Sequence, residues 1–154
     1  MLVSACLLGA ACAYDGRPRY HRRLHETAGS STVAVCPEQL GGLCTPRLPS
    51  EITGGTGCDV LNHRARVLNS CGDDLSHHFR RGAWETVKLG CQLGAELAVF
   101  KPRSPSCGPQ KHYDGTFSEQ LRRGSGVTAS ALQRVGIGVL TPRQFLQDFA
   151  EDDR

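Results

Sequence analysis

Met1-Leu2-Val3-Ser4-Ala5-Cys6 opens the chain with an apolar run that ends at a cysteine, and two later segments repeat the pattern. Residues 32–35 (TVAV) lead into Cys36, and residues 97–101 (LAVFK) lead into a Pro-rich turn that holds Cys107. Runs of this length between turn residues are typical of strands buried on both faces of a parallel sheet. Because ligands of open α/β sheets bind at the carboxyl ends of the strands, we expect the three thiols to share one edge.

Helical periodicity accompanies these strands. Apolar positions recur at helical spacing from Asp73 to about Gly94, directly before the strand at 97–101, and a helix at 128–135 precedes a strand at 136–140. Thr141, Pro142 and Gln144 then supply the N-cap, N1 and N3 residues of a last helix. Alternating strands and helices predict an α/β fold with a mostly parallel, Rossmann-like sheet flanked by helices.

The middle of the chain is richer in turn residues. Glycines and prolines over residues 37–57 predict an irregular loop, in which the GGTG run at 54–57 is interpreted as a flexible joint. That run lacks the residues of a phosphate-binding loop. Residues 59–61 and 66–68, separated by a polar tetrapeptide, predict a small hairpin insertion.

Length and composition restrict the class of protein. A chain of 154 residues is expected to form one domain, residues 1–154, with a core that needs no disulfides. A net charge of +3 argues against nucleic-acid binding. No segment has the roughly 18 apolar residues of a membrane span, and the apolar N-terminus lacks the basic residues of a signal peptide. We therefore expect a cytoplasmic protein whose eight cysteines are reduced or metal-bound.

Three thiolates at one sheet edge suit metal chemistry. Such a set would hold three corners of a metal cluster and leave a fourth open to substrate. Small, rigid residues around Cys6, Cys36 and Cys107 would let backbone N–H groups approach the sulfurs of a cluster. The spacing includes no C-x-x-C pair, so a set of buried apolar cysteines stays open on spacing alone.

The motifs around these cysteines resemble the thiouracil desulfidase family, small cluster-binding proteins formerly catalogued as a domain of unknown function. The resemblance spans essentially the whole chain. It rests on Val3–Gly9 (VSACLLG), Tyr14–Gly16 (YDG), Cys36–Leu43 (CPEQLGGL), Thr45–Arg47 (TPR), Glu51–Ile52 (EI), Ser104–Gly108 (SPSCG), Tyr113–Phe117 (YDGTF) and Gly126–Ala129 (GVTA). It implies a [4Fe-4S] cluster on Cys6, Cys36 and Cys107, with a fourth iron that takes the sulfur of a thiolated pyrimidine.

Hydrolytic removal of sulfur from a thiolated uracil-type base then needs a base and proton donors. Glu38, two residues after Cys36, is the candidate general base that activates water. Ser104 and Ser106 are candidates for proton relay or substrate contact, and the resemblance favours Ser104 for the catalytic role. Lys101 is a candidate for binding an anionic form of the substrate.

Other interpretations remain open from the sequence. A cluster or thiol protein that binds or transfers sulfur without hydrolysis would need the same cysteines but not Glu38. A zinc protein would use Cys58, Cys71, His77 and His78, although adjacent histidines on a helix point about 100° apart. A thiolated tRNA base is a further possible substrate. Five cysteines fall outside this site and are interpreted as structural, with Cys44 near enough in sequence to lie beside it: Cys12, Cys44, Cys58, Cys71 and Cys91.

Overall fold

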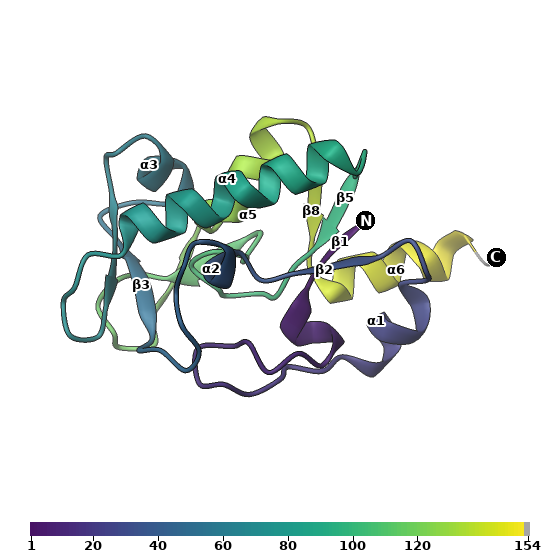
Figure 1. The fold of residues 1–154 in the computed structure, drawn as a ribbon, viewed down its shortest axis with the longest axis horizontal. Helices are drawn as coiled ribbons and strands as arrows, with labels where there is room; N and C mark the ends of the chain where they lie inside the picture. The colour runs from purple at the N-terminus through teal and green to yellow at the C-terminus, as the bar shows by residue number, and fades with distance from the viewer. Residues whose placement is uncertain (153–154) are drawn as a thin grey trace.

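The computed structural model describes residues 1–152, with side chains described through Asp148. Four parallel strands form the central sheet in the order β2-β1-β5-β8 (Figure 1). Their register aligns Leu2 with both Val33 and Ala98, so β1 has a parallel neighbour on each side. The predicted mostly parallel sheet is thereby confirmed; its strands are β1 (Leu2–Ser4), β2 (Val33–Val35), β5 (Leu97–Val99) and β8 (Gly138–Leu140).

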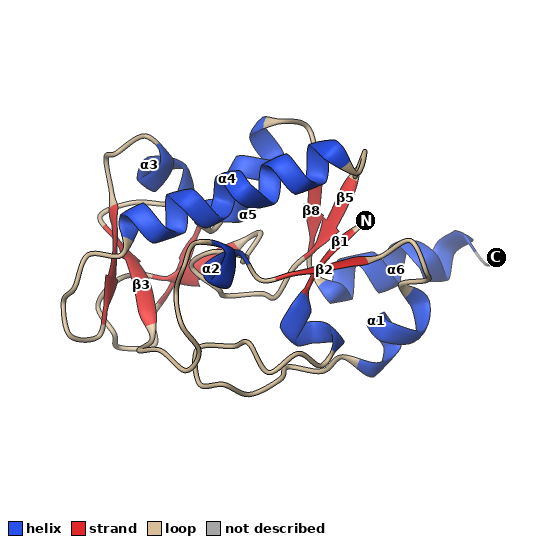
Figure 2. Cartoon of the chain, viewed as in Figure 1, coloured by secondary structure: helices blue, strands red, loops and turns tan. Residues whose placement is uncertain are grey.

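Helices cover both faces of this sheet. The side chains of Leu2 and Ala98 pack into the core beneath α4 and α5, whereas those of Val3 and Val99 pack into a second cluster with Leu24 of α1. This alternation follows from the two-residue period of a strand. Figure 2 shows α4 (Ser76–Gln92) and α5 (Val127–Arg134) on one side and α1 (Arg22–Thr27) and α6 (Pro142–Asp152) on the other.

The predicted helices lie close to their expected ranges. One face of α4 is buried at helical spacing, at Ser76, Phe79, Gly82, Ala83, Thr86, Val87 and Gly90. At the start of α6, the Gln144 side chain accepts hydrogen bonds from the Thr141 backbone N–H and hydroxyl, and the Thr141 hydroxyl accepts one from the Gln144 N–H. The predicted capping box of the last helix is therefore confirmed.

The predicted hairpin of residues 59–61 and 66–68 is wrong in its first strand. Residues 59–61 belong to α3 (Gly57–Leu61), because the Asp59 carboxylate accepts hydrogen bonds from the Thr56 N–H and hydroxyl and caps the helix. The glycine run at 54–57 therefore leads into a capped helix and is no flexible joint. The partner of β4 (Arg66–Asn69) is β3 (Ser50–Thr53), in an antiparallel pair.

The segment 37–57, predicted as an irregular loop, contains β3 and the short helix α2 (Pro37–Leu40). A second antiparallel pair, β6 (Lys111–Tyr113) and β7 (Leu121–Arg123), has no counterpart in the sequence prediction, because its strands are short and polar. The chain between β1 and β2 starts with a 3-10 helix, η1 (Ala5–Leu8), which contains Cys6. Strands β3 and β6 contribute residues to the cavity described below.

Glycines let α2 lie directly against α4. A Cβ atom on Gly82 of α4 would overlap the carbonyl oxygen of Pro37, and one on Gly41 would overlap the carbonyl oxygen of His78. The two backbones approach as closely as glycine permits. Since Cys36 and Glu38 flank Pro37, this contact fixes where both side chains stand.

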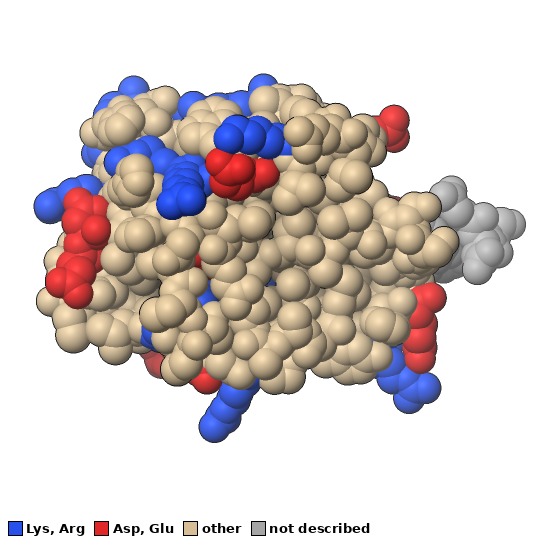
Figure 3. Space-filling model, viewed as in Figure 1, with Lys and Arg blue, Asp and Glu red and all other residues tan. Residues whose placement is uncertain are grey.

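Charges of both signs lie on the exposed side of α4. Arg80 and Arg81 are near the start of this helix, and Lys88 forms an ion pair with Glu85 at 2.8 Å. In Figure 3 blue and red side chains gather side by side over this region, and most of the same face is uncharged. Within residues 1–152, no helix is both long enough and apolar enough to cross a membrane.

The contact between α2 and α4 predicts unequal effects of alanine on stability at two glycines of α4. Gly82→Ala should lower the free energy of unfolding by at least about 2 kcal/mol, because the new methyl group meets rigid backbone. Gly90→Ala should stay within about 1 kcal/mol of the parent, since its methyl meets only the far ends of side chains, the nearest being Cδ1 of Ile137 at 2.9 Å, and alanine favours the helix. Urea denaturation of both variants measures this; equal effects would contradict the assigned contact.

Candidate active site

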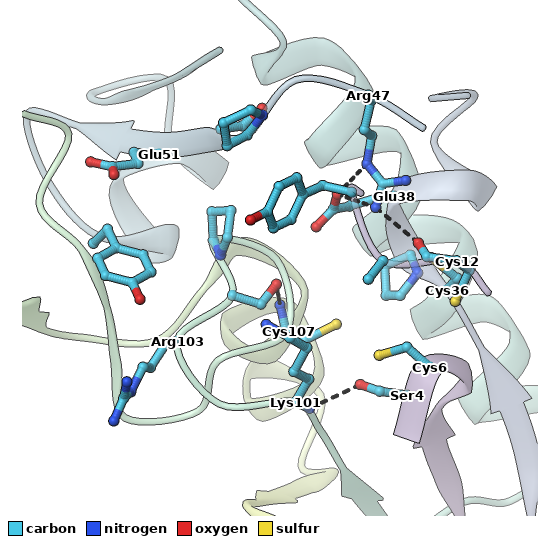
Figure 4. Close-up of a pocket in the computed structure, with 18 of the residues that line it drawn as sticks. Ser4, Cys6, Cys12, Cys36, Glu38, Arg47, Glu51, Lys101, Arg103 and Cys107 are labelled. Carbon is cyan, nitrogen blue, oxygen red and sulfur yellow. Dashed lines mark hydrogen bonds and ion pairs between the residues drawn. The ribbon is translucent and has the colours of Figure 1, made fainter. Parts of the chain in front are cut away.

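A cavity of about 320 Å³ opens at the carboxyl edge of the parallel sheet. Cys6 enters it from η1, directly after β1; Cys36 enters it as the residue between β2 and α2; Cys107 enters it from the loop after β5. Figure 4 shows these three cysteines around a common space. The structure therefore brings together three thiols that are 30 and 71 positions apart in sequence, as the strand pattern predicts.

The Ser104 hydroxyl shapes the loop that carries Cys107. Its Oγ accepts hydrogen bonds from the backbone N–H of Ser106 at 3.2 Å and of Cys107 at 3.0 Å. Ser104 is 7% exposed and lines the cavity. A hydroxyl that accepts two hydrogen bonds still carries its own proton, so Ser104 both fixes the Cys107 loop and can donate into the cavity.

Ser106 lies elsewhere. Its side chain is 1% exposed, does not line the cavity, and shares a hydrogen bond of 2.7 Å with the Thr128 hydroxyl. Its carbonyl oxygen accepts the N–H of Thr128, and the carbonyl of Pro105 accepts that of Val127. Ser106 therefore attaches the Cys107 loop to the start of α5, and the structure gives no support to its expected contact with substrate.

Glu38 and Arg47 form a buried ion pair beside the thiols. Arg47 Nε and Nη2 each lie 2.6 Å from Glu38 Oε2, and the two side chains are 8% and 14% exposed. Arg47 also donates to the carbonyl oxygens of Cys12 and Cys44, each at 3.2 Å. Arg47 lies within a motif, but no role could be assigned to it from the sequence, because its contact with Glu38, nine positions earlier, forms only in the folded chain.

Cys12 is a fourth thiol of the cavity. It is 5% exposed, lines the cavity, and its carbonyl oxygen lies 3.8 Å from Cys36 Sγ. From the sequence Cys12 was expected to be structural and outside the site, because it matches no motif of the resemblance. Cys44 does not line the cavity and contacts the Pro46 carbonyl at 3.5 Å; it is exposed, as are Cys58, Cys71 and Cys91.

The thiols affect one another's ionisation. A hydrogen bond with the Cys12 side chain lowers the pKa of Cys6, while a hydrogen bond with Cys12 raises that of Cys36. Burial raises the pKa of Cys107 to about 12. Cys36 and Cys107 are therefore protonated at neutral pH, and a bound metal would have to displace their protons.

The described residues form no site for a single metal ion. Among the side chains that the structure describes, no three His, Cys, Asp or Glu residues converge closely enough to hold one metal ion. The zinc site expected as an alternative at Cys58, Cys71, His77 and His78 is therefore wrong; Cys58 instead contacts Arg134 Nη2 at 3.2 Å. In an iron–sulfur cluster each thiolate binds a different iron, so its ligands surround a shared space, as Cys6, Cys36 and Cys107 do.

Two cations border the cavity. Lys101 follows β5, and its backbone N–H donates to the Ser4 hydroxyl at 3.0 Å. Arg103 is exposed and has a backbone φ of +63°. Neither side chain forms an ion pair with a described residue. In Figure 4 Lys101 lies beside the thiols, whereas Arg103 and Glu51 lie on the other side of the cavity.

The protein is thus an α/β protein with a parallel sheet and a cysteine-lined cavity at the carboxyl edge of that sheet. Comparison with known proteins identifies the family. The family model described as 2-thiouracil desulfurase matches residues 1–144. The chain belongs to the 2-thiouracil desulfurase family, which confirms the family expected from the motifs.

Two relatives match nearly the whole chain. The uncharacterized protein YbbK of Bacillus subtilis (strain 168) is 39% identical over 145 residues, 94% of this chain and 96% of that protein. The solved structure of the [4Fe-4S]-dependent thiouracil desulfidase TudS aligns at 34% identity with a TM-score of 0.84, over 100% of this chain and 98% of that chain. The fold is therefore shared from end to end with a protein whose activity depends on an iron–sulfur cluster.

The ion pair at the site predicts a large stability effect. Arg47→Met should lower the free energy of unfolding by about 3 kcal/mol, because the buried Glu38 carboxylate loses its only charged partner among the described residues. Arg19→Met removes the more exposed pair with Asp15 and should cost less than about 1 kcal/mol. Denaturant unfolding of both variants compares the two; similar losses would show that Glu38 does not depend on Arg47.

Proposed function

We propose that this chain is a [4Fe-4S]-dependent desulfidase that hydrolyses the C–S bond of thiolated uracil-type bases to give the oxo base and sulfide. One observation carries the proposal: Cys6, Cys36 and Cys107 share a cavity with a carboxylate that an arginine holds in place. The match to TudS in sequence and fold supports the same assignment.

The three cysteines fit the cluster. Thiolates are the ligands that iron–sulfur clusters prefer, and the rigid Cys107 loop and the α2–α4 contact hold two of them on fixed backbone. Three protein ligands leave one iron without a protein side chain. When bound, the cluster would supply a Lewis acid for the soft sulfur of a thiocarbonyl group.

Glu38 is suited to act as the general base. Nε and Nη2 of Arg47 both contact Oε2 of Glu38, and Oε1 of Glu38 accepts no hydrogen bond from the part of the chain that the structure describes. One oxygen thus fixes the carboxylate while the other is available to accept a proton from water. Arg47 is a positioning residue here, since it acts on the reaction only through Glu38.

Ser104 and Lys101 complete the set of polar groups. The proton of the Ser104 hydroxyl can pass to the leaving sulfur or to the substrate, because the oxygen is already held by two backbone N–H groups. Lys101 lies in the same cavity and balances the negative charge of thiolates or of an ionised base. Ser106 has no part in this proposal.

The overall reaction balances without electron transfer. Water adds to the thiocarbonyl carbon and gives up one proton to Glu38; the C–O bond forms and the C–S bond breaks. The sulfur leaves as sulfide, which takes up the proton from Glu38 and the proton left on the added oxygen. The product carries oxygen where the substrate carried sulfur. No carbon changes oxidation state, so no electron donor is needed.

The alternative is a protein that uses the same cysteines to bind or transfer sulfur without hydrolysis. Glu38 discriminates between the two functions, because a sulfur carrier needs no base for water. The buried pair with Arg47 favours hydrolysis: a binding protein would gain little from a fixed carboxylate inside its metal cavity.

Glu38→Gln should retain iron and acid-labile sulfide but release sulfide from 2-thiouracil or 4-thiouracil at least about 100-fold more slowly, because general base catalysis is lost. Glu119→Gln is the matched control, since Glu119 also lines the cavity but is exposed. The assay is sulfide release under anaerobic conditions. If Glu38→Gln releases sulfide at the parent rate, Glu38 is not the base; if the parent releases none while holding iron, the sulfur-carrier function is favoured.

A further inference from the structure

Glu51 is a buried carboxylate of the cavity that the proposed chemistry does not use. It stands in β3, is 8% exposed, and its Oε2 accepts hydrogen bonds from the backbone N–H of Gly115 at 2.9 Å and of Phe117 at 3.0 Å. Hydrogen bonds to a charged acceptor are about twice as strong as neutral ones. Glu51 therefore ties β3 to a turn that lies 64 and 66 positions further along the chain.

That turn, residues 114–117, is closely packed and fixed. Asp114 Oδ1 accepts hydrogen bonds from the N–H of Thr116 at 3.0 Å and from its hydroxyl at 2.5 Å. Gly115 has a φ of +93°, and an added Cβ there would lie 2.7 Å from the Ile52 carbonyl oxygen of β3. The turn therefore rests directly against the strand that carries Glu51.

Phe117 ends this turn in an unfavourable conformation. Its φ is +55°, a left-handed value that costs a bulky residue about 1–3 kcal/mol and persists only where the surroundings impose it. Its side chain is 40% exposed although it is large and apolar, and Phe117 lines the cavity. The two N–H groups bound to Glu51 are among the interactions that impose this conformation.

The position of Phe117 suits a planar ligand. The cavity lining is more apolar than polar and also includes Tyr14, which is 44% exposed, and Tyr113. An aromatic ring that is left half in water at a cavity offers its face to a flat heterocycle, and stacking of a base on an aromatic side chain is sequence-tolerant because every base has a π-face. The polar groups around the thiols give no such preference for flatness.

We propose that Phe117 determines substrate specificity by stacking on the flat face of a heteroaromatic thiobase, and that Glu51 positions Phe117 through its backbone. This inference rests on the proposed function and adds to it the feature of the substrate that the cavity recognises. The preference for an aromatic ring over a puckered one is a property of binding, and it can be measured without turnover.

Uracil and 5,6-dihydrouracil are the matched probes, because they share their polar groups and differ in planarity. Binding to the cluster-loaded chain is measured by calorimetry without oxygen. Uracil should bind more tightly than dihydrouracil. Phe117→Leu should remove this preference by lowering the affinity for uracil about 5- to 100-fold. Phe117→Tyr should preserve it. Parent protein that binds both probes equally, or Phe117→Leu with an unchanged preference, would overturn the proposal.

Glu51→Gln and Glu51→Ala test the positioning role. Gln keeps an acceptor for the two N–H groups and should retain most of the preference, whereas Ala should lose it to the extent that Phe117→Leu does. In the double variant Glu51→Ala, Phe117→Leu the losses should not add, because both act through one ring. Additive losses, or Glu51→Ala that lowers stability with an unchanged preference, would show that Glu51 has only a structural role.

Steady-state kinetics with 2-thiouracil separates this proposal from the function itself. Phe117→Leu should raise KM and leave kcat near the parent value, since stacking is equally present in the ground and transition states. If the parent turns over no thiouracil but still prefers uracil to dihydrouracil, the desulfidase function fails and the stacking role stands. If it turns over thiouracil with an unchanged KM in Phe117→Leu, the stacking role fails alone.

Discussion

The parallel pairing of β1 with both β2 and β5 is the constraint on which the site depends. Ser4 is level with Val35, and Val3 is level with Val99, so the three strands end within one residue of the same height. In a parallel sheet every carboxyl end points the same way, and the residues that follow must share that edge. Cys6 and Cys36 follow their strands within two residues, so their convergence is a direct result of the register.

Cys107 needs a second constraint, because it lies eight positions after β5. The Ser104 hydroxyl closes the turn on the cysteine N–H, and backbone hydrogen bonds attach the loop to the start of α5. On the opposite side, glycine contacts hold α2 against α4, and Arg47 holds Glu38. Each of these contacts lies outside the sheet and fixes a group that the sheet alone would leave free.

Such rigidity matters for chemistry in a cavity with an apolar lining. Charges interact more strongly there than in water, and a carboxylate or thiolate without a partner is costly. The fold meets this requirement for Glu38 with Arg47 and for Glu51 with two backbone N–H groups. The polar groups of the site are thus held by short interactions, while Phe117, which also lines the cavity, stays 40% exposed.

The sequence predicts the features that depend on local pattern. The strands before Cys6 and Cys36, the α4 periodicity and the capping box at Thr141 all follow from residue order over a few positions, and motif resemblance adds the family. Burial on both faces was wrong for β2, which is an edge strand with Ala34 exposed. The features that depend on pairing between distant segments were missed or wrong. Thr56 and Asp59 cap a helix where a strand was expected, β3 pairs with β4 across that helix, and the role of Arg47 follows from a contact formed only in the folded chain.

The residues at the sheet edge show the same limit. Ser106 stands in a motif beside Cys107 and was expected to contact substrate, but its hydroxyl shares a hydrogen bond with Thr128 at the start of α5, which packs against this loop. Cys12 was set aside and lies inside the cavity. No local pattern separates these two cases, since the direction of a loop side chain is decided by the segment packed against it.

Iron and acid-labile sulfide, measured on protein reconstituted without oxygen, decide whether Cys6, Cys36 and Cys107 hold a cluster. We expect about four irons per chain in the parent protein and a major loss of iron in each of Cys6→Ala, Cys36→Ala and Cys107→Ala. The exposed cysteines provide matched controls, and Cys44→Ala and Cys91→Ala should keep the parent content. A parent that takes up no iron, or that keeps its iron when Cys6, Cys36 and Cys107 are all replaced, would contradict the three-thiolate site.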